Sequence, residues 1–493
     1  MKKIILILIG FGILLSCESQ LDINRDPDNL TPTQLALEVE LPGSITAVAG
    51  VQGANWAIIG GIWSQMWSQS PGSSQYRVID NYTLGTTDGI STGSWSSAYD
   101  GLLDLRNLKA NAEIQENWNY YLIATVLETY LSHMLTDWYG DIPYTEASNP
   151  LILQPHFDSG QDVYDLLVAD LDEALVHNLS ASKGKLPGSD DLVFGGNMNN
   201  WIKFANTLKL KIFLRQTEAR PTVAETGITS LLNTGAQFLD VDAALTGFTD
   251  APNVSNPLYE SDKRQLNTSL NLRASTTMHS YLTDNLDTRL SLFYTTGNPV
   301  NQGDYNNPAG PATFAVSILY PETPVYFISL EESLFMQAEA RERYNIGVSD
   351  AKALYDAAVM ENFNKWSIVD ERENDPALGL DGTSYIASGG VYEYPSAGTF
   401  DEKLTAIITQ KWIASYPGNG AEAFFEWHRT GIPATSPIYQ TDPTYVSGEF
   451  VVSLNGVLGS GFPQRLLYPT GETSTNQNAP AVVPITTPIW WNQ

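Results

Sequence analysis

The sequence predicts a mostly α-helical protein: a single large helical body with tetratricopeptide-like helix pairs, long loops and few short β-strands. Three observations support this fold class. Apolar residues recur with the 3.6-residue period of an α-helix in segments spread from residue 35 to residue 429. The stretches between these segments are long and rich in Gly, Pro, Asn and Thr. No stretch resembles a linker that would divide residues 35–493 into separate domains.

The first expected helix is a tryptophan-rich segment at residues 35–69. Trp56, Gly60, Trp63 and Trp67 stand at i, i+4, i+7 and i+11, which is one helix face, so we expect them to form a core stripe. Gly60 and the glycine after it would let another helix approach. The further helices are expected from near Ser94 onward and at 119–140, 161–178, 198–219, 328–345, 349–366, 400–416 and 419–429.

Local signals predict where some of these helices begin and end. Gly140 can take a left-handed cap conformation, and Pro143 just beyond it prevents the helix from continuing. Ser159 followed by Asp162 resembles a capping box with Asp in place of Glu at the start of the next helix. In that next helix, Asp170 alone interrupts the apolar stripe.

The helices at 328–345 and 349–366 form a pair joined by a short Asn-Ile-Gly turn. The pair has about the size of a tetratricopeptide unit, although the full signature of that repeat is absent. Long loops are expected at 70–94, 245–275, 296–325, 367–400 and 432–490, with 325–330 a candidate for a short β pair. Long ordered loops in compact domains are usually functional.

The composition excludes some classes of partner. Asp and Glu number 55 against 26 Lys and Arg, a formal net charge of −29. This excess argues against nucleic acid, which needs clustered basic residues, and against a basic patch for anionic lipid heads. Aromatic residues reach 11%, and Tyr and Trp suit both a core and a binding surface.

The N-terminus predicts export and lipid attachment. Two lysines and an apolar run too short to span a bilayer make residues 1–16 a signal peptide. The run ends at Cys17, the one cysteine in 493 residues, preceded by the small Ser16. This ending resembles the bacterial lipobox, which implies a diacylglycerol on the Cys17 sulfur and acylation of its amino group. Residues 17–34 are then a lipid-anchored tether, and 35–493 the folded domain.

The tether crowds Asp22, Asn24, Asp26 and Asp28 together, as a calcium loop would. Asx turns and helix capping account for the same residues, and we favour that interpretation. No cofactor and no metal site are expected.

Motifs that would indicate an enzyme are weak. Residues 89–93 match G-x-S-x-G, but no hydrophobic strand precedes them, so the match is attributed to chance. His133 and Asp137 share a helix face near Asp141, and a buried hydrogen-bonded histidine explains them better than a metal site. A facing carboxylate pair of the glycosidase kind is not excluded by the sequence.

Eight motifs occur in an order that resembles a known family. They are DWYGDIPYTEA at 137–147, WIKFANTLKLKIFLR at 201–215, LDTRL at 286–290, ISLEESLFMQAEA at 328–340, YDAAV at 355–359, ITQKWIASYPGNGAEAFFEWHRTGIP at 408–433, FPQRLLYP at 462–469 and TPIWWN at 487–492. The set resembles the SusD/RagB family, and within it the branch of nutrient-binding outer-membrane lipoproteins. The motifs themselves are expected to be mostly scaffold, with Asp287 and Arg289 fixing a turn and Gly431 ending a helix.

The resemblance implies a cell-surface, outer-membrane lipoprotein without enzymatic activity. Such a protein captures oligosaccharides and delivers them to a partner TonB-dependent (SusC-like) transporter. Its ligand site is implied on loops that here are 70–95 and 250–310. Two alternatives stay open: oligopeptides as the ligand of the same architecture, and a lipid-anchored hydrolase with an unrecognised carboxylate pair.

Aromatic rings that stack on sugars and polar groups that bind hydroxyls are the side chains such a site needs. We predict Tyr76, Tyr82 and Trp95 as stacking residues, although Trp95 and Tyr99 are also spaced as a core pair on a helix. The predicted polar contacts are Arg77, Asp80 and Asn81, with Tyr259, Arg264 and Asn267 contributing from the second loop region.

Overall fold

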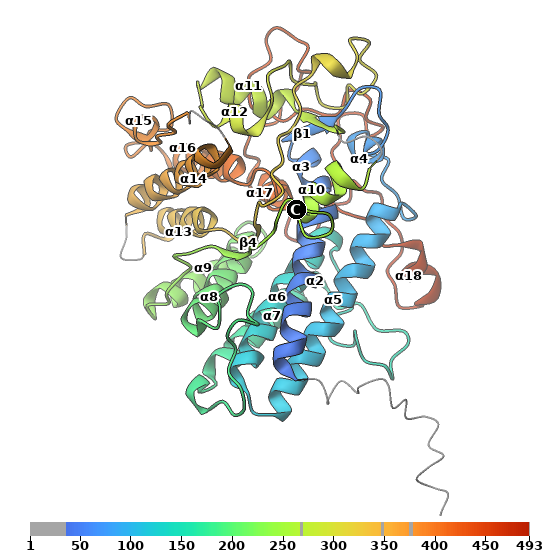
Figure 1. Ribbon diagram of the computed structural model, residues 1–493, viewed down its shortest axis with the longest axis vertical. Helices are drawn as coiled ribbons and strands as arrows, with labels where there is room; N and C mark the ends of the chain where they lie inside the picture. The colour runs from blue at the N-terminus through green and yellow to red at the C-terminus, as the bar shows by residue number, and fades with distance from the viewer. Residues whose placement is uncertain (1–35, 267–269, 347–349, 374–377, 493) are drawn as a thin grey trace, which may run out of the picture.

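The computed structural model describes residues 36–266, 270–346, 350–373 and 378–492, and helices dominate it (Figure 1). The predicted mostly α-helical class is confirmed, because the described strands form only two small antiparallel pairs, β1–β3 and β2–β4. The predicted signal peptide, Cys17 and the tether lie outside the described residues.

The α-helices are α2 (Leu37–Val51), α3 (Ala57–Trp63), α4 (Arg77–Asp80), α5 (Gly89–Ile114), α6 (Trp118–Tyr139), α7 (Gly160–Val176), α8 (Met198–Arg215), α9 (Pro221–Asn233), α10 (Pro257–Tyr259), α11 (Thr276–Asp284), α12 (Leu290–Phe293), α13 (Leu330–Tyr344), α14 (Ala351–Glu373), α15 (Thr383–Ile386), α16 (Phe400–Ala414), α17 (Gly420–Thr430) and α18 (Thr470–Thr475). The π-helical segments are η2 (Gln52–Trp56) and η4 (Glu260–Arg264), and the 3-10 segments are η3 (Leu179–Ala181) and η5 (Pro311–Thr313). The strands are β1 (Trp67–Gln69), β2 (Ala243–Leu245), β3 (Leu272–Ala274) and β4 (Val325–Ile328).

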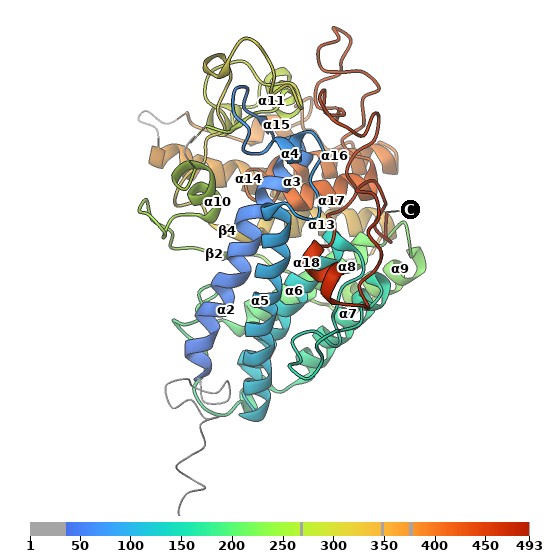
Figure 2. The same cartoon turned by 90° about the vertical axis from the view of Figure 1, so that its right-hand side faces the viewer.

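Most long helices pack against the next long helix along the chain. α2 packs on α5, α5 on α6 and α6 on α7, while α8 pairs with α9 and α13 with α14. The chain enters this bundle through α2 at its lower end, and the loops around β1, α4 and α11 gather at the opposite end (Figures 1 and 2). The predicted helix pair at 328–345 and 349–366 is therefore confirmed as α13 and α14, and the loops sit on one end of a helical scaffold.

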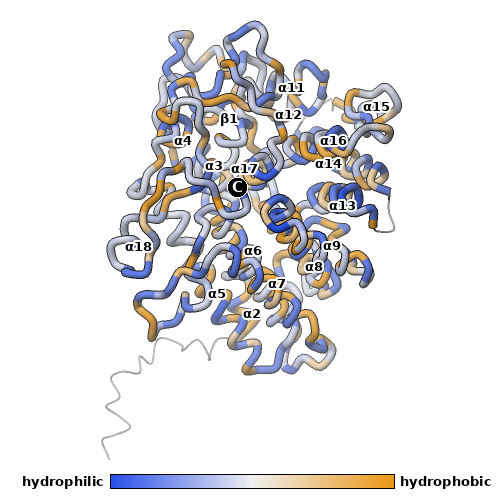
Figure 3. Tube along the Cα trace, turned by 180° about the vertical axis from the view of Figure 1, so that it is seen from behind, coloured by the Kyte–Doolittle hydropathy of each residue, from blue (hydrophilic) through white to orange (hydrophobic). Residues whose placement is uncertain are grey.

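α7 shows how the sequence pattern produces a helix. Its buried side chains, among them Val163, Leu167 and Leu171, follow the 3.6-residue period, and the Ser159 hydroxyl accepts a hydrogen bond from the Asp162 amide at the N-terminus. Asp170, which interrupts the stripe, accepts a hydrogen bond from the Tyr144 hydroxyl at 2.5 Å. Figure 3 shows the resulting mixture of apolar and polar residues along α7, α8 and α13.

The first helical run needs a correction. Helix was predicted to residue 69, but α3 ends at Trp63, and the positive φ of 57° at Gln65 turns the chain so that Trp67 enters β1. Trp67 is still buried in the core. By length and composition the run Leu37–Trp63 could span a membrane, but 72% of its apolar window is buried inside the protein, as in a core helix.

Gly60 allows two helices to touch. A Cβ at Gly60 would lie 2.0 Å from the Ala421 amide nitrogen, and one at Gly420 would lie 2.3 Å from the Gly61 amide nitrogen. Only residues without a side chain fit where α3 crosses the start of α17, so the predicted close approach of a second helix is confirmed.

Other helix boundaries also differ from the predicted ones. α5 begins at Gly89 rather than near Ser94, and α14 continues to Glu373. α9 was not predicted, although Pro221 occupies its first turn, a position where Pro favours helix initiation. Gly140 does have a positive φ of 85° after α6, but its ψ of −113° is not the predicted left-handed cap. Gly431 ends α17 in the left-handed conformation, as predicted.

Several recognised motifs meet in a buried cluster of charges. Arg215 of α8 contacts Glu422 of α17 at 2.6 Å and Asp137 of α6 at 3.2 Å, and Arg429 contacts Glu339 of α13 at 2.7 Å. Each of these side chains is at most 4% exposed. Buried charges need such partners. The motifs are therefore scaffold, as expected.

A second buried pair holds the turn before α12. Arg289 and Asp287 are both fully buried and lie 2.6 Å apart. Asp287 also accepts a hydrogen bond from Tyr392, and the Arg289 guanidinium donates to Asn362. The predicted role of this pair in fixing a turn is confirmed.

Candidate functional site

The structure brings the two predicted loop regions together. β1 pairs with β3, with Trp67 opposite Ala274, and the Tyr76 hydroxyl donates a hydrogen bond to Asp262 at 3.2 Å. Residues 70–82 and the middle third of the chain therefore meet at the loop end of the molecule. Their contacts are mostly internal.

Tyr76 and Tyr82 are not exposed stacking surfaces. Their exposed fractions are 3% and 4%. The Tyr82 hydroxyl accepts a hydrogen bond from the Ser453 amide at 3.1 Å, and burial, followed by the charge of Asp262, raises the pKa of Tyr76 well above its usual range. Both hydroxyls have buried polar partners, so these rings fasten the loop to the body, which corrects the prediction for this conformation.

Asp80 is likewise internal rather than a surface contact. It is fully buried, and its carboxylate accepts hydrogen bonds from the Ser68 hydroxyl, the Gln69 amide and the Gln302 side chain, the last at 2.7 Å. Burial raises its pKa to about 7, and the hydrogen bonds oppose that rise. These donors occupy its oxygens, so Asp80 joins three segments instead of facing solvent.

Arg77 and Asn81 stay partly exposed. The Arg77 guanidinium lies 5.0 Å from the centre of the Tyr305 ring, and its Nε donates to the Ser73 carbonyl at 2.9 Å. Asn81 Oδ1 accepts from the Thr83 amide at 3.1 Å, as in an Asx turn. Their role in binding remains a prediction.

Tyr259 and Arg264 form a pair on the second loop region. The Arg264 guanidinium lies 5.2 Å from the centre of the Tyr259 ring and pairs with Asp250 and Glu260. Both residues are partly exposed, so their role in binding also remains a prediction. Asn267 lies outside the described residues.

Trp95 lies in a different place, on α5, in a cluster of aromatic rings. Its ring centroid is 4.8 Å from those of Tyr99 and Tyr139, 5.8 Å from that of Tyr468 and 6.3 Å from that of Phe157. Trp95 is 6% exposed, while Tyr99 is more accessible. The two interpretations of this pair, core and binding surface, are compatible, because the cluster forms the floor of a groove.

The groove has a volume of about 530 Å³, within the range of ligand sites. Three segments far apart in the sequence line it: one face of α5, the loop that follows α6, and α18, which lies beside α5 in Figures 1 and 2. Besides the two aromatic residues, its principal lining residues are Ser96, Asp100, Ser148, Leu153, Glu472 and Asn476.

Hydrogen bonds hold the walls of the groove together. Asn476 donates to the Pro155 carbonyl and to Glu472, both at 2.9 Å, which ties α18 to the loop. The Tyr99 hydroxyl donates to the Pro143 carbonyl at 3.1 Å. Burial raises the pKa of Tyr99 well above its usual range, so the hydroxyl stays a donor. The groove is thus preformed, which lowers the entropy cost of binding.

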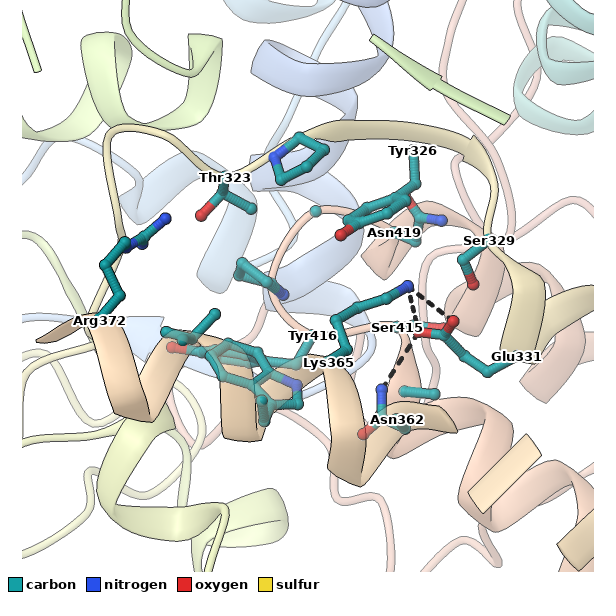
Figure 4. A pocket seen from close by; sticks show the side chains of 16 residues that line it. Thr323, Tyr326, Ser329, Glu331, Asn362, Lys365, Arg372, Ser415, Tyr416 and Asn419 are labelled. Carbon is teal, nitrogen blue, oxygen red and sulfur yellow. Dashed lines mark hydrogen bonds and ion pairs between the residues drawn. The ribbon is translucent and has the colours of Figure 1, made fainter. Parts of the chain in front are cut away.

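A second cavity is small (Figure 4). It lies between α14 and the turn at 414–419, where Lys365 contacts Glu331 at 2.7 Å and Trp366 forms part of the wall. Its volume is about 60 Å³, room for a few water molecules but far below that of ligand pockets. It is not suited to a sugar.

The features that could indicate an enzyme have structural explanations. Residues 89–93 form the first turn of α5, with no strand directly before them. His133 is fully buried, as predicted, and burial lowers its pKa, so it is neutral. The predicted hydrogen bond is absent: neither ring nitrogen has a partner among the described residues, and Asp137 lies 3.6 Å away. The described chain contains no cluster of three residues that could hold a metal ion.

The polar wall of the groove was missed by the sequence analysis. Asp100 follows Tyr99 directly, and its place on the same helix was the one available signal. Glu472 and Asn476 lie about 370 residues further along in a stretch expected to be loop, and nothing in the sequence connects them with α5.

Comparison with known proteins agrees with this architecture. A family model described as SusD-like, starch-binding and associating with the outer membrane matches residues 51–447. A chitin-binding SusD homolog from Flavobacterium johnsoniae is 20% identical, with a TM-score of 0.70 over 92% of this chain and 98% of that one. A SusD homolog from Bacteroides uniformis is 22% identical, with a TM-score of 0.71 over 92% and 99%.

A SusD/RagB family protein from Bacteroides thetaiotaomicron is 20% identical, with a TM-score of 0.74 over 93% of this chain and 99% of that one. No curated protein sequence matches significantly. At these identities, the solved structures support the fold alone.

Proposed function

Because the chain belongs to the SusD-like family of starch-binding proteins that associate with the outer membrane, we propose that it captures oligosaccharides at the cell surface. The observation that carries this proposal is the preformed groove above the Trp95 and Tyr99 rings. Aromatic rings pack against the apolar faces of sugars, and Ser96 and Ser148 supply hydroxyl groups beside them.

The relatives support a polysaccharide ligand. The family description names starch, and two structures of the same fold are described as chitin-binding. Both are polymers of pyranose sugars, which present apolar ring faces to aromatic side chains. We therefore expect the groove to bind a short stretch of such a polymer.

The double substitution Trp95→Ala/Tyr99→Ala tests this proposal. It removes both rings from the groove and should weaken binding of maltohexaose or chitohexaose about tenfold or more, a loss of about 1.4 kcal/mol. Isothermal titration calorimetry on the purified protein measures the change. Trp118→Ala is the matched control, because Trp118 is a partly exposed tryptophan that stacks on His177, away from the groove.

If the double variant folds and binds as tightly as the wild type, the site lies elsewhere. Arg77, Asn81, Tyr259 and Arg264 would then be the residues to replace, since they remain partly exposed at the loop end. Circular dichroism and thermal melting separate a lost ligand contact from a lost fold, because the aromatic cluster also packs α5 against its neighbours.

Delivery to a TonB-dependent SusC-like transporter and attachment through a lipid on Cys17 complete the proposed role. The family description supports an outer-membrane location. We propose no enzymatic step, in keeping with a family described by binding.

An oligopeptide ligand is the second candidate, and one observation favours it. Asp100 and Glu472 make the groove acidic, which would suit a basic peptide.

The same two carboxylates could serve a hydrolase. Breakdown of the bound oligosaccharide that stops on Asp100→Asn would support that alternative instead.

A further inference from the structure

We propose that the groove prefers amino sugars that carry a positive charge over neutral and acidic sugars. This inference rests on the proposed function and assigns a ligand class to the same site. The charged side chains that line the groove are Asp100 on α5 and Glu472 on α18, and neither Lys nor Arg lines it. A cationic substituent on a sugar held by the two aromatic rings would therefore meet only negative charge.

The basic groups near the groove already have partners. Arg106 donates to Glu128 at 2.8 Å and to the carbonyls of Tyr144 and Ala147, so it faces the back of the loop wall. His156 contacts Glu146 at 3.0 Å. These contacts hold the groove walls in place. They pair the two basic groups with Glu128 and Glu146, not with the two carboxylates that line the groove.

Arg465 lies beneath the aromatic floor. It donates to the Tyr139 carbonyl and the Tyr468 hydroxyl, and it is 8% exposed. A uronic acid or a sulfated sugar in the groove would therefore not reach its guanidinium.

The negative field extends beyond the lining residues. Asp104 lies one turn after Asp100 on α5, and burial, followed by repulsion from Asp100, raises the pKa of Asp104. The smaller of these two causes, the repulsion, means that the two carboxylates on this helix lie close enough to act on each other. An added cation would relieve that repulsion, while an added carboxylate would increase it.

The shape of the groove favours a saccharide over a basic peptide. Peptides that bind in extended form commonly add a strand to an exposed sheet edge. The groove is lined by helices and a loop, and none of the four described strands contributes to it. The partly exposed Tyr99 ring, backed by the buried Trp95, instead provides a surface for a sugar ring.

The decisive experiment compares hexamers of glucosamine, N-acetylglucosamine and galacturonic acid, with hexalysine as the peptide probe, at about pH 6 in low salt. The partly exposed carboxylates should make the glucosamine hexamer bind roughly 2- to 10-fold more tightly than the N-acetylated hexamer. The galacturonic acid hexamer should bind most weakly. About 1 M salt, where charges more than about 3 Å apart are screened, should remove the preference.

Substitutions then locate the effect. Asp100→Asn/Glu472→Gln should reduce the preference for the glucosamine hexamer to near 1. The matched control is Glu113→Gln/Glu371→Gln, which removes two exposed carboxylates outside the groove lining and should keep the preference. This control is needed because a chain with a net charge of −29 attracts any polycation.

Each outcome separates the two proposals. Equal binding of the glucosamine and N-acetylglucosamine hexamers, or a preference lost equally in both double variants, overturns the charge inference and leaves sugar capture standing. Binding of hexalysine more tightly than any saccharide, through Asp100 and Glu472, overturns both in favour of a peptide ligand. No binding of any saccharide, maltohexaose included, overturns the proposed function itself.

Discussion

At the level of single residues, buried carboxylates in this protein differ according to whether a cation is near. Glu426 is buried against Arg429, Lys411 and Arg215, and these charges outweigh the burial and hold its pKa well below the usual range. Asp80 is equally buried but has only neutral hydrogen-bond donors, and its pKa rises to about 7. Neutral donors therefore offset only part of the cost of burying a charge.

The raised pKa of Asp80 predicts a specific pH dependence. Below about pH 4, Asp80 is protonated in both the folded and the unfolded protein. As pH rises from about 4 to about 7, the unfolded chain loses this proton and the folded protein keeps it, so the free energy of unfolding falls. The side-chain amide of the Asp80→Asn variant has no such proton to lose, so we expect the free energy of unfolding of this variant, relative to that of the wild type, to increase by about 1 to 4 kcal/mol over this pH range.

Urea unfolding at a series of pH values measures this difference. Glu371→Gln is the control, because Glu371 is exposed on α14 and its profile should run parallel to that of the wild type. A constant difference between Asp80→Asn and the wild type from pH 4 to pH 8 would show that Asp80 is ionised in the folded protein.

The candidate site illustrates what residue types can and cannot reveal. The loop at 70–94 was predicted to carry ligand contacts, but Tyr76, Tyr82 and Asp80 are buried and their polar groups have partners inside the protein. Burial depends on which distant segment covers a residue, here Asp262 and Ser453. Sequence spacing identified Trp95 and Tyr99 as a pair, yet only the fold shows that α18 faces them.

At the level of secondary-structure elements, the helices were predictable because their periodic apolar faces are local patterns. α6, α8 and α13 lie within a few residues of the expected ranges. Errors occur where tertiary contacts decide the boundary. The helical pattern of the first segment continues to Trp67, but pairing of β1 with β3 takes that residue into a strand.

Gly60→Ala tests the crossing of α3 and α17. The new Cβ would lie 2.0 Å from backbone atoms of Ala421, which cannot move without displacing α17. We expect a loss of about 3 kcal/mol or more in the free energy of unfolding, or failure to fold.

Gly50→Ala is the matched control for Gly60→Ala. Gly50 lies in α2, and a Cβ there meets no atom within 4 Å. Alanine should stabilise this helix by about 0.5 to 1 kcal/mol, because it loses less backbone freedom than glycine on folding. Chemical denaturation compares both variants with the wild type, and equal stability of the two variants would mean that the helices separate without cost.

At the level of the whole molecule, the two ends of the described chain are held differently. The C-terminal Trp491 is buried against the charge cluster, where its Nε1 donates to Asp137 at 2.9 Å. The chain enters the fold at the start of α2, which lies at the end of the bundle opposite the loops (Figure 2). An anchor on Cys17 would therefore hold the protein by the end away from its loops.

The reach of that anchor has an upper limit. The 20 Cα-to-Cα steps from Cys17 to Leu37 span at most about 70 Å when the chain is fully extended. The 26 residues of α5 measure about 39 Å. The proposed tether is thus long enough for the body to change its orientation at the membrane.

Cys17→Ala tests the anchor. Without its sulfur, the chain cannot receive the diacylglycerol, and a membrane attachment based on two or more acyl chains is lost. We expect the variant to appear in the soluble fraction of cells without incorporating labelled fatty acid, while the wild type stays with the membranes. Ser19→Ala, two residues further along, should behave as the wild type. Retention of Cys17→Ala in the membrane fraction, with oligosaccharide binding intact, would show that a protein contact rather than a lipid holds the domain at the surface.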